Sequence, residues 1–120
     1  MDESEEEHII GNYYVGWADM ESNRTICFRK DPEGQTSRTI ISGYIFAVGN
    51  DSSYIIAKSH PGVTTDITYY HIVDVREEKL TNFHTDNCWT TESKKKFNLK
   101  RSELGILNLE FDKNYTENPW

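Results

Sequence analysis

The sequence predicts an α+β domain in which an antiparallel β-meander of five to six strands carries one C-terminal helix packed against the sheet. Three aromatic and β-branched runs lie between residues 38 and 75, and polar turns separate them, as is typical of consecutive antiparallel strands. Residues 92–104 form the one segment with clear helical start and stop signals. At 120 residues, the chain has the length of one domain with one core.

The expected strands are short and follow one another closely along the chain. They cover residues 9–18, 24–29, 39–48, 53–58, 67–75 and 107–111. The first two should pair as a hairpin, and the glycines of the first indicate a bulge or a close backbone approach. The third is apolar on both faces, which predicts a central position in the sheet, and the turn at residues 49–52 should pair it with the fourth.

The helix is expected to begin after Thr90 or Thr91, either of which can cap its first turn, and to end at Gly105. Phe97 and Leu104 are seven residues apart and therefore mark one apolar stripe that can lie on the sheet. The lysines of this segment should face water: Lys94, Lys95, Lys96 and Lys100.

Charge and composition divide the chain into three parts. Residues 1–8 are so acidic that we expect a flexible leader, residues 9–112 should form the α+β domain, and residues 113–120 a C-terminal tail. The formal net charge is -7. Because the phosphate backbone of a nucleic acid would be repelled by this charge, we expect no nucleic-acid partner.

The compartment is left open by the sequence. The longest apolar run is far shorter than the roughly 20 residues that cross a bilayer, so we expect no transmembrane segment. Cys27 and Cys88 are the two cysteines. If the protein is exported they can form a disulfide, and if it is not they can remain free thiols. Because the sequence has no CxxC spacing, we expect no structural zinc site.

The sequence contains no motif that predicts catalysis. A nucleophile elbow, a zinc-protease helix and a phosphate-binding glycine loop are all missing. His84, Asp86 and Cys88 alternate along one segment and could project ligands to one side, but such a composition is more typical of a polar turn before a helix. We therefore expect neither an enzyme nor a bound cofactor or metal.

Aromatic residues are the best candidates for a binding surface. The chain has seven Tyr and three Trp, and these side chains combine a large contact area with a polar group. The alternative is that they are half-buried sheet residues, which is the usual position of Tyr. The candidate binding residues are Tyr13, Tyr14, Trp17, Tyr69, Tyr70 and His71.

Four segments carry a resemblance to a family: Val48–Asp51, Tyr54–Lys58, Tyr69–Asp74 and the helix end Glu103–Ile106. In these the chain resembles an uncharacterised family of small bacterial β-rich domains that are often found as predicted lipoproteins. The resemblance spans about residues 9 to 111 and implies an exported domain with a lipidated cysteine upstream of Asp2. It carries over no catalytic residue.

The leading functional interpretation is a non-enzymatic binding or accessory domain of a bacterial envelope lipoprotein. A mobile acidic leader, a compact sheet and no catalytic motif suit a tethered module. Its partner would be another protein or an envelope component, and its location periplasmic or on the cell surface, with the cytoplasm as the alternative. The second interpretation is an immunity protein that inhibits a toxin through an acidic, aromatic surface. The third is a small hydrolase or metal-binding protein.

Overall fold

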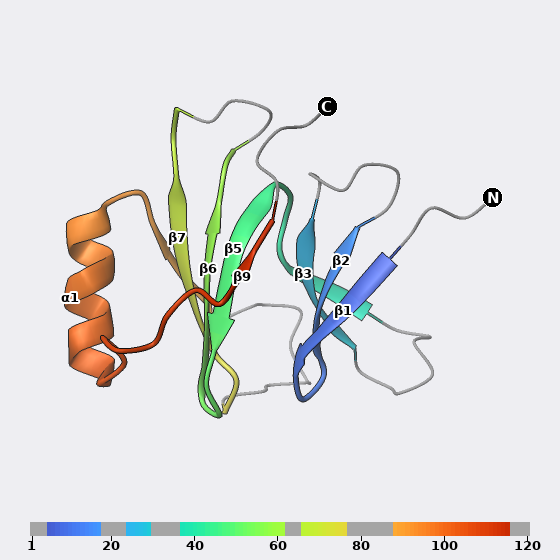
Figure 1. Ribbon diagram of the computed structural model, residues 1–120, viewed down its shortest axis with the longest axis horizontal. Helices are drawn as coiled ribbons and strands as arrows, with labels where there is room; N and C mark the ends of the chain where they lie inside the picture. Colours follow the sequence, from blue (N-terminus) through green and yellow to red (C-terminus); the bar gives the residue numbers. More distant parts are fainter. Residues whose placement is uncertain (1–4, 18–23, 30–36, 62–65, 77–87, 116–120) are drawn as a thin grey trace.

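The protein is seen here in a computed structural model, which describes residues 5–17, 24–29, 37–61, 66–76 and 88–115. Three layers follow one another along the long axis: a helix, a five-stranded sheet and a four-stranded sheet (Figure 1). All strand pairs are antiparallel. The predicted α+β class, with one helix packed against antiparallel strands, is thus confirmed. However, the described residues contain nine strands in two sheets, where one meander of five to six was expected.

The four-stranded sheet, here called the N-terminal sheet, has the order β1-β2-β3-β4. Its strands are β1 (Glu5–Ile10), β2 (Tyr13–Trp17), β3 (Thr25–Arg29) and β4 (Ser37–Ile41). Alternation in β3 buries Ile26 and Phe28 and leaves Thr25, Cys27 and Arg29 partly exposed, as a strand with one core-facing side requires.

The five-stranded sheet, here called the C-terminal sheet, has the order β8-β7-β6-β5-β9. Its strands are β5 (Ile45–Asn50), β6 (Tyr54–Ser59), β7 (Tyr69–Asp74), β8 (Cys88–Thr91) and β9 (Lys113–Asn114). Asp51 fixes the β5–β6 turn, because its carboxylate accepts hydrogen bonds from the backbone N–H groups of Ser53 and Tyr54 at 2.7 and 2.8 Å. The middle strand β6 is buried at every position but Lys58, and its neighbour β7 is buried at its three central residues, His71, Ile72 and Val73.

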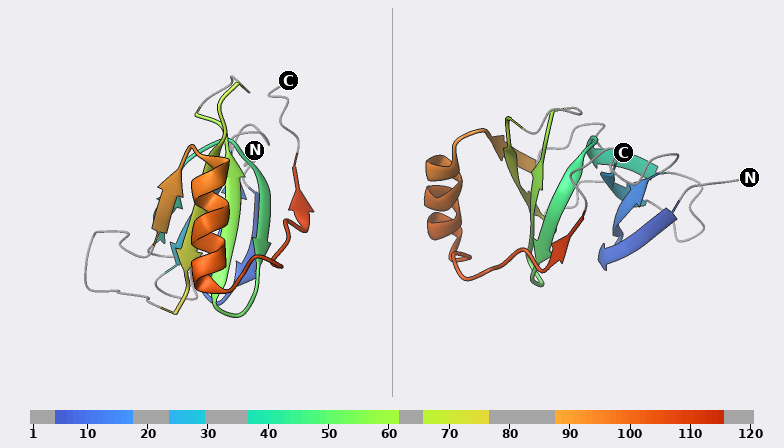
Figure 2. Two further views of the ribbon diagram at one scale, coloured as in Figure 1. Left: turned by 90° about the vertical axis from the view of Figure 1, so that its left-hand side faces the viewer. Right: turned by 45° about the horizontal axis from the view of Figure 1, so that its top comes forward.

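Helix α1 (Lys94–Leu104) lies on the outer face of the C-terminal sheet (Figure 2). The cap is Ser93, two or three residues later than expected, and its hydroxyl accepts from the backbone N–H of Lys96 at 3.1 Å. The helix ends at Gly105 as predicted, in the left-handed conformation with φ 74°. Phe97 is buried and Leu104 partly buried, which confirms the apolar stripe. Among the described residues, no helix is both long and apolar enough to cross a membrane.

Two apolar clusters hold the layers together. The first lies between the sheets and includes Tyr13, Val15 and Ile26 of the N-terminal sheet with Ile55 and Val73 of the C-terminal sheet. The second lies under the helix, where Phe97 stacks on Tyr70 with ring centroids 4.9 Å apart and packs on Ile56 and Ile72. The C-terminal sheet is therefore the central layer, and its two faces serve different neighbours.

The third predicted strand, residues 39–48, is wrong as a single element. The chain leaves the N-terminal sheet after Ile41, turns at residues 42–44 and enters the C-terminal sheet at Ile45. Gly43 and Tyr44 have φ values of 64° and 60°. At these two left-handed residues the chain turns out of the N-terminal sheet, so the apolar residues on the two sides of this corner belong to different sheets.

The ends of the described chain also differ from the predicted strands. One first strand was expected over residues 9–18. The structure instead has a hairpin of β1 and β2, which turns at Gly11 with φ 58°. β1 starts at Glu5, which lies inside the predicted leader. Two contacts hold these acidic residues in the sheet: Glu6 forms an ion pair with Arg29, and Glu7 accepts a hydrogen bond from the Tyr115 hydroxyl. Burial and this bond to Glu7 raise the pKa of Tyr115.

Residues 107–111 do not form the predicted last strand. The Arg101 guanidinium binds two backbone carbonyls of this segment, at 2.8 Å from that of Leu107 and 2.5 Å from that of Leu109. Strand pairing starts later, at β9, in the segment predicted as a tail. The carbonyls that a strand would offer to a neighbouring strand are thus used by the helix.

Candidate binding cleft

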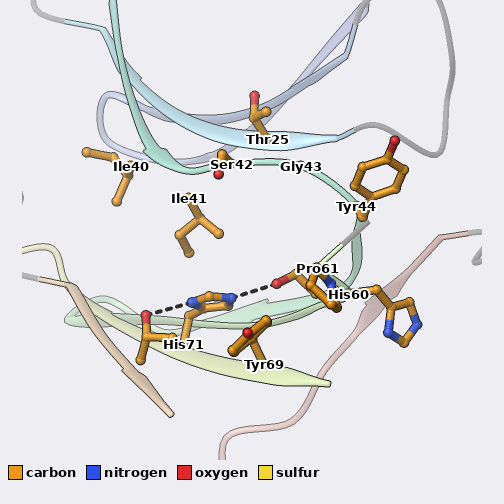
Figure 3. Close-up of a pocket in the computed structure, with 12 residues that line it drawn as sticks. Thr25, Ile40, Ile41, Ser42, Gly43, Tyr44, His60, Pro61, Tyr69 and His71 are labelled. Atoms are coloured by element: carbon orange, nitrogen blue, oxygen red, sulfur yellow. Dashed lines mark hydrogen bonds between the residues drawn. The ribbon is translucent and has the colours of Figure 1, made fainter. Parts of the chain in front are cut away.

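A cleft of about 650 Å³ lies at one end of the interface between the two sheets (Figure 3). The N-terminal sheet and the corner after β4 form one wall, and the ends of β6, β7 and β8 form the other. Its principal lining residues are Ile40, Ile41, Ser42, Tyr44, Ser59, Tyr69, His71 and Thr90. The core of a sandwich ends where the inward-facing side chains are too small or too polar to fill the space between the sheets. At this end of the interface, β6, β7 and β8 place polar side chains on their inner face, and the cleft begins there.

Three polar side chains form a hydrogen-bonded row across these strands, here called the Ser59–His71–Thr90 relay. The Ser59 hydroxyl lies 2.8 Å from His71 Nε2, and the Thr90 hydroxyl lies 2.9 Å from His71 Nδ1. His71 pairs directly with Ala57 and with Thr90 in the sheet register, and Ser59 is two residues beyond Ala57. Side chains two residues apart in a strand share a face, so all three point toward the cleft.

His71 is neutral at physiological pH. Its side chain is only 6% exposed, and burial lowers its pKa from 6.5 to about 4. A neutral imidazole has one N–H donor and one nitrogen acceptor, which matches a ring that is bonded to one hydroxyl at each nitrogen. The relay therefore places hydrogen-bonding capacity, and no charge, at the floor of the cleft.

This neutrality predicts a loss of stability in mild acid. The unfolded chain binds a proton at His71 near pH 6.5, whereas the folded chain resists it until about pH 4, so the free energy of unfolding falls as the pH drops through this window. Between pH 7 and 4.5 the expected loss from this residue is about 2 to 3 kcal/mol. Urea unfolding of the wild type and of His71→Gln at both pH values measures it. An identical pH dependence of the two proteins would contradict the assignment.

His60 is a buried residue of the cleft lining whose ring points away from the relay (Figure 3). Its ring stacks on Phe46 with centroids 4.3 Å apart, and its Nδ1–H donates to the carbonyl of Ile67 at 2.8 Å. Its backbone N–H donates to the carbonyl of Tyr44 at 3.1 Å. His60 thus anchors the left-handed corner at residues 42–44, which forms the rim of the cleft, and its ring is held away from the relay.

The six predicted binding residues do not share one face. Tyr13 is 1% exposed and belongs to the core between the sheets. Tyr14 lies on the outer face of the N-terminal sheet, 4.8 Å from the Arg29 guanidinium. Trp17 lies against the guanidinium of Arg24, at 5.0 Å.

The other three candidates lie on β7 and are divided by the alternation of that strand. Tyr70 is on the outer face, stacked on Phe97 under the helix. Tyr69 and His71 line the cleft. The structure therefore brings two of the six together in a cavity, and these are the two that can contact a ligand there.

Sequence reasoning missed Ser59 and Thr90. The fourth strand was expected to end at Lys58, and Thr90 was considered only as one of two candidate helix caps, with Thr91 as the other. The signal for Ser59 was present, since it continues the inward-facing series of Ile55 and Ala57. No comparable signal marked Thr90, because its role depends on the pairing of β8 with β7.

The structure gives both cysteines as free thiols. Burial raises the pKa of Cys88, against a smaller opposing effect of its hydrogen bond to Thr90, so this thiol is poorly activated as a nucleophile. Within the described ranges, no group of three or more His, Cys, Asp or Glu residues is arranged to hold a metal ion. His84 and Asp86, which were considered with Cys88, lie outside those ranges.

The fold and the cleft together define a small α+β domain with two packed antiparallel sheets and an uncharged cavity at one end of their interface. The family model described as "Protein of unknown function (DUF3997)" matches residues 10–115, so the chain belongs to this family. This confirms the predicted resemblance to an uncharacterised family. The searches of curated proteins and of solved structures found no match.

Proposed function

We propose that the chain is a non-enzymatic binding domain of a bacterial envelope lipoprotein and that it holds its ligand in the cleft between the two sheets. The observation that carries the proposal is the cleft itself, at about 650 Å³, in which the buried polar side chains of Ser59 and His71 lie among apolar, aromatic and small polar residues. Ligand sites have volumes of about 300–1,000 Å³ and combine apolar walls with a few placed polar groups.

The chemistry of the relay supports binding over catalysis. A hydroxyl bonded to an imidazole is the starting arrangement of a serine nucleophile, but such a nucleophile needs a histidine that is readily protonated and stabilised by a third group. Burial here lowers the pKa of His71 to about 4, and its third group is the neutral hydroxyl of Thr90. A protonated His71 would therefore be poorly stabilised during a reaction.

The envelope location in this proposal is supported by the sequence resemblance to predicted lipoproteins. Its test is the intact mass of the protein from fractionated native cells. An acylated species in the membrane fraction is the expected result, and an unmodified species in the cytosolic fraction would contradict it. The immunity interpretation gains no comparable support, since its aromatic residues are divided between two sheets and the interior.

Ligand binding is tested by a fragment screen on the ¹⁵N-labelled domain. We expect chemical-shift changes at residues that line the cleft, such as Tyr69 and Ser42. Ser42→Trp places a bulky side chain at the exposed rim and should weaken binding of every such fragment by about tenfold or more. Ser52→Trp, at an exposed turn away from the cleft, is the matched control and should have no effect. Shifts that survive Ser42→Trp, or no shifts in the cleft, would overturn the proposal.

A further inference from the structure

The position of the relay explains why it can act on a ligand. Ser59, His71 and Thr90 come from three neighbouring strands and occupy the inner face of the C-terminal sheet, beside the apolar residues Ala57 and Val73. Ser59 and His71 are 3% and 6% exposed. They are therefore shielded from bulk water and yet line the cleft, where a ligand can reach them.

The relay has two chemically different ends. Neutral His71 accepts a hydrogen bond at one nitrogen and donates at the other. The hydroxyl that donates to the ring keeps its lone pairs for a further hydrogen bond, and the hydroxyl that accepts from the ring still has its O–H to donate. At Thr90 the hydroxyl also lies 3.9 Å from Cys88 Sγ, so a ligand there competes with that weak contact. One end therefore offers an acceptor and the other a donor, and a change of the His71 tautomer exchanges them. A ligand group that can both donate and accept fits either tautomer.

The remainder of the cleft disfavours charged ligands. None of the described residues that line it is Asp, Glu, Lys or Arg. An ionised group that leaves water without a partner of opposite charge loses its hydration and gains little in return. Ile40, Ile41, Tyr44 and Tyr69 add apolar and aromatic surface. These walls suit a flat or apolar body attached to the polar group.

We propose that the cleft selects small uncharged ligands in which a group that both donates and accepts hydrogen bonds is attached to an apolar body, and that the Ser59–His71–Thr90 relay binds this group. The inference rests on the proposed function, because it names the ligand class of the same cleft. The ligand contacts the hydroxyl of Ser59 or of Thr90, and the tautomer of His71 determines which of these two hydroxyls donates a hydrogen bond to the ligand.

Three probes of matched shape and different charge test the proposal: benzamide, benzoate and benzamidinium. Each has a phenyl ring and a planar substituent, and at pH 7 they are neutral, negative and positive. Dissociation constants are measured by titration of the ¹⁵N-labelled domain. We expect benzamide to bind at least about tenfold more tightly than either ion, since only the ions lose hydration without compensation.

Variants at Thr90 connect this preference to the relay. Thr90→Val keeps the shape and removes the hydroxyl, so the affinity for benzamide should fall by about three- to tenfold. Thr90→Ser restores the hydroxyl and should restore binding. Circular dichroism and urea unfolding of both variants establish that they are folded, and the pH profile of His71 provides an independent readout, because loss of a hydrogen-bond partner shifts its titration.

The outcomes separate the two proposals. Equal binding of the three probes, tighter binding of an ion, or an unchanged affinity in Thr90→Val would overturn the ligand class and leave the cleft as a binding site. Failure of benzamide to bind while other fragments shift cleft residues would overturn it as well. If no fragment and no probe shifts any residue of the cleft, the proposed function fails together with the ligand class.

Discussion

Phe97→Ala is expected to lower the free energy of unfolding by about 3–5 kcal/mol, which is the range for removing a fully buried aromatic side chain. Phe97 is 2% exposed and is the one buried side chain of α1. It stacks on Tyr70, lies 6.1 Å from the ring of Phe111 and packs on the outer face of the C-terminal sheet. Its truncation removes the one buried side chain that the helix places against the sheet.

Urea unfolding followed by circular dichroism measures this effect, with Leu99→Ala as the matched control. Leu99 belongs to the same helix but is 58% exposed, so its truncation should change the free energy of unfolding by less than about 0.5 kcal/mol. Comparable losses in the two variants would show that the second apolar cluster does not attach the helix as described.

The second large effect is expected at Gly49, where alanine should cost about 3 kcal/mol, the upper part of the range for overpacked sites. A Cβ atom built at Gly49 would overlap the carbonyl oxygen of Glu110 and lie 3.1 Å from the Cα of Phe111. These are backbone atoms and cannot rotate away. The segment after the helix would have to lift from β5, and with it Phe111 would leave the second cluster.

Gly105→Ala separates crowding from backbone conformation. Gly105 has φ +74°, and a Cβ atom there meets nothing within 4 Å. Alanine at this position therefore costs only the strain of its left-handed backbone, which should lower the free energy of unfolding by about 1 kcal/mol. Thermal or urea unfolding of the two alanine variants compares them directly. If Gly49→Ala costs no more than Gly105→Ala, the close backbone approach at Gly49 is not tight in solution.

Local signals predicted the parts of the fold that depend on neighbouring residues. The turn at Asp51 and the glycine at the end of α1 are each determined within a few residues, and these elements lie where they were expected. Which sheet a strand joins is determined by tertiary packing. Residues 39–48 carry apolar side chains on both faces of the predicted strand, so their pattern did not indicate that the chain changes sheets at Gly43 and Tyr44.

The cleft was less accessible to sequence reasoning than the fold. His71 lies 12 residues from Ser59 and 19 from Thr90, and their contact follows from the order and register of three strands. His71 was selected as part of an aromatic surface, and its role in a neutral relay appears only once its two hydroxyl partners and its burial are known. Tyr13 and Tyr70 were selected by the same argument and serve the core instead.

The succession of strands in the two sheets has a consequence for folding kinetics. In the described chain every strand pair joins neighbours along the sequence except β5 with β9. Apart from β9, each sheet can therefore assemble from local hairpins with small loop-closure costs before the two sheets pack on each other. The cleft exists only after that meeting. A ligand bound in it would therefore slow unfolding and leave the rate of folding almost unchanged.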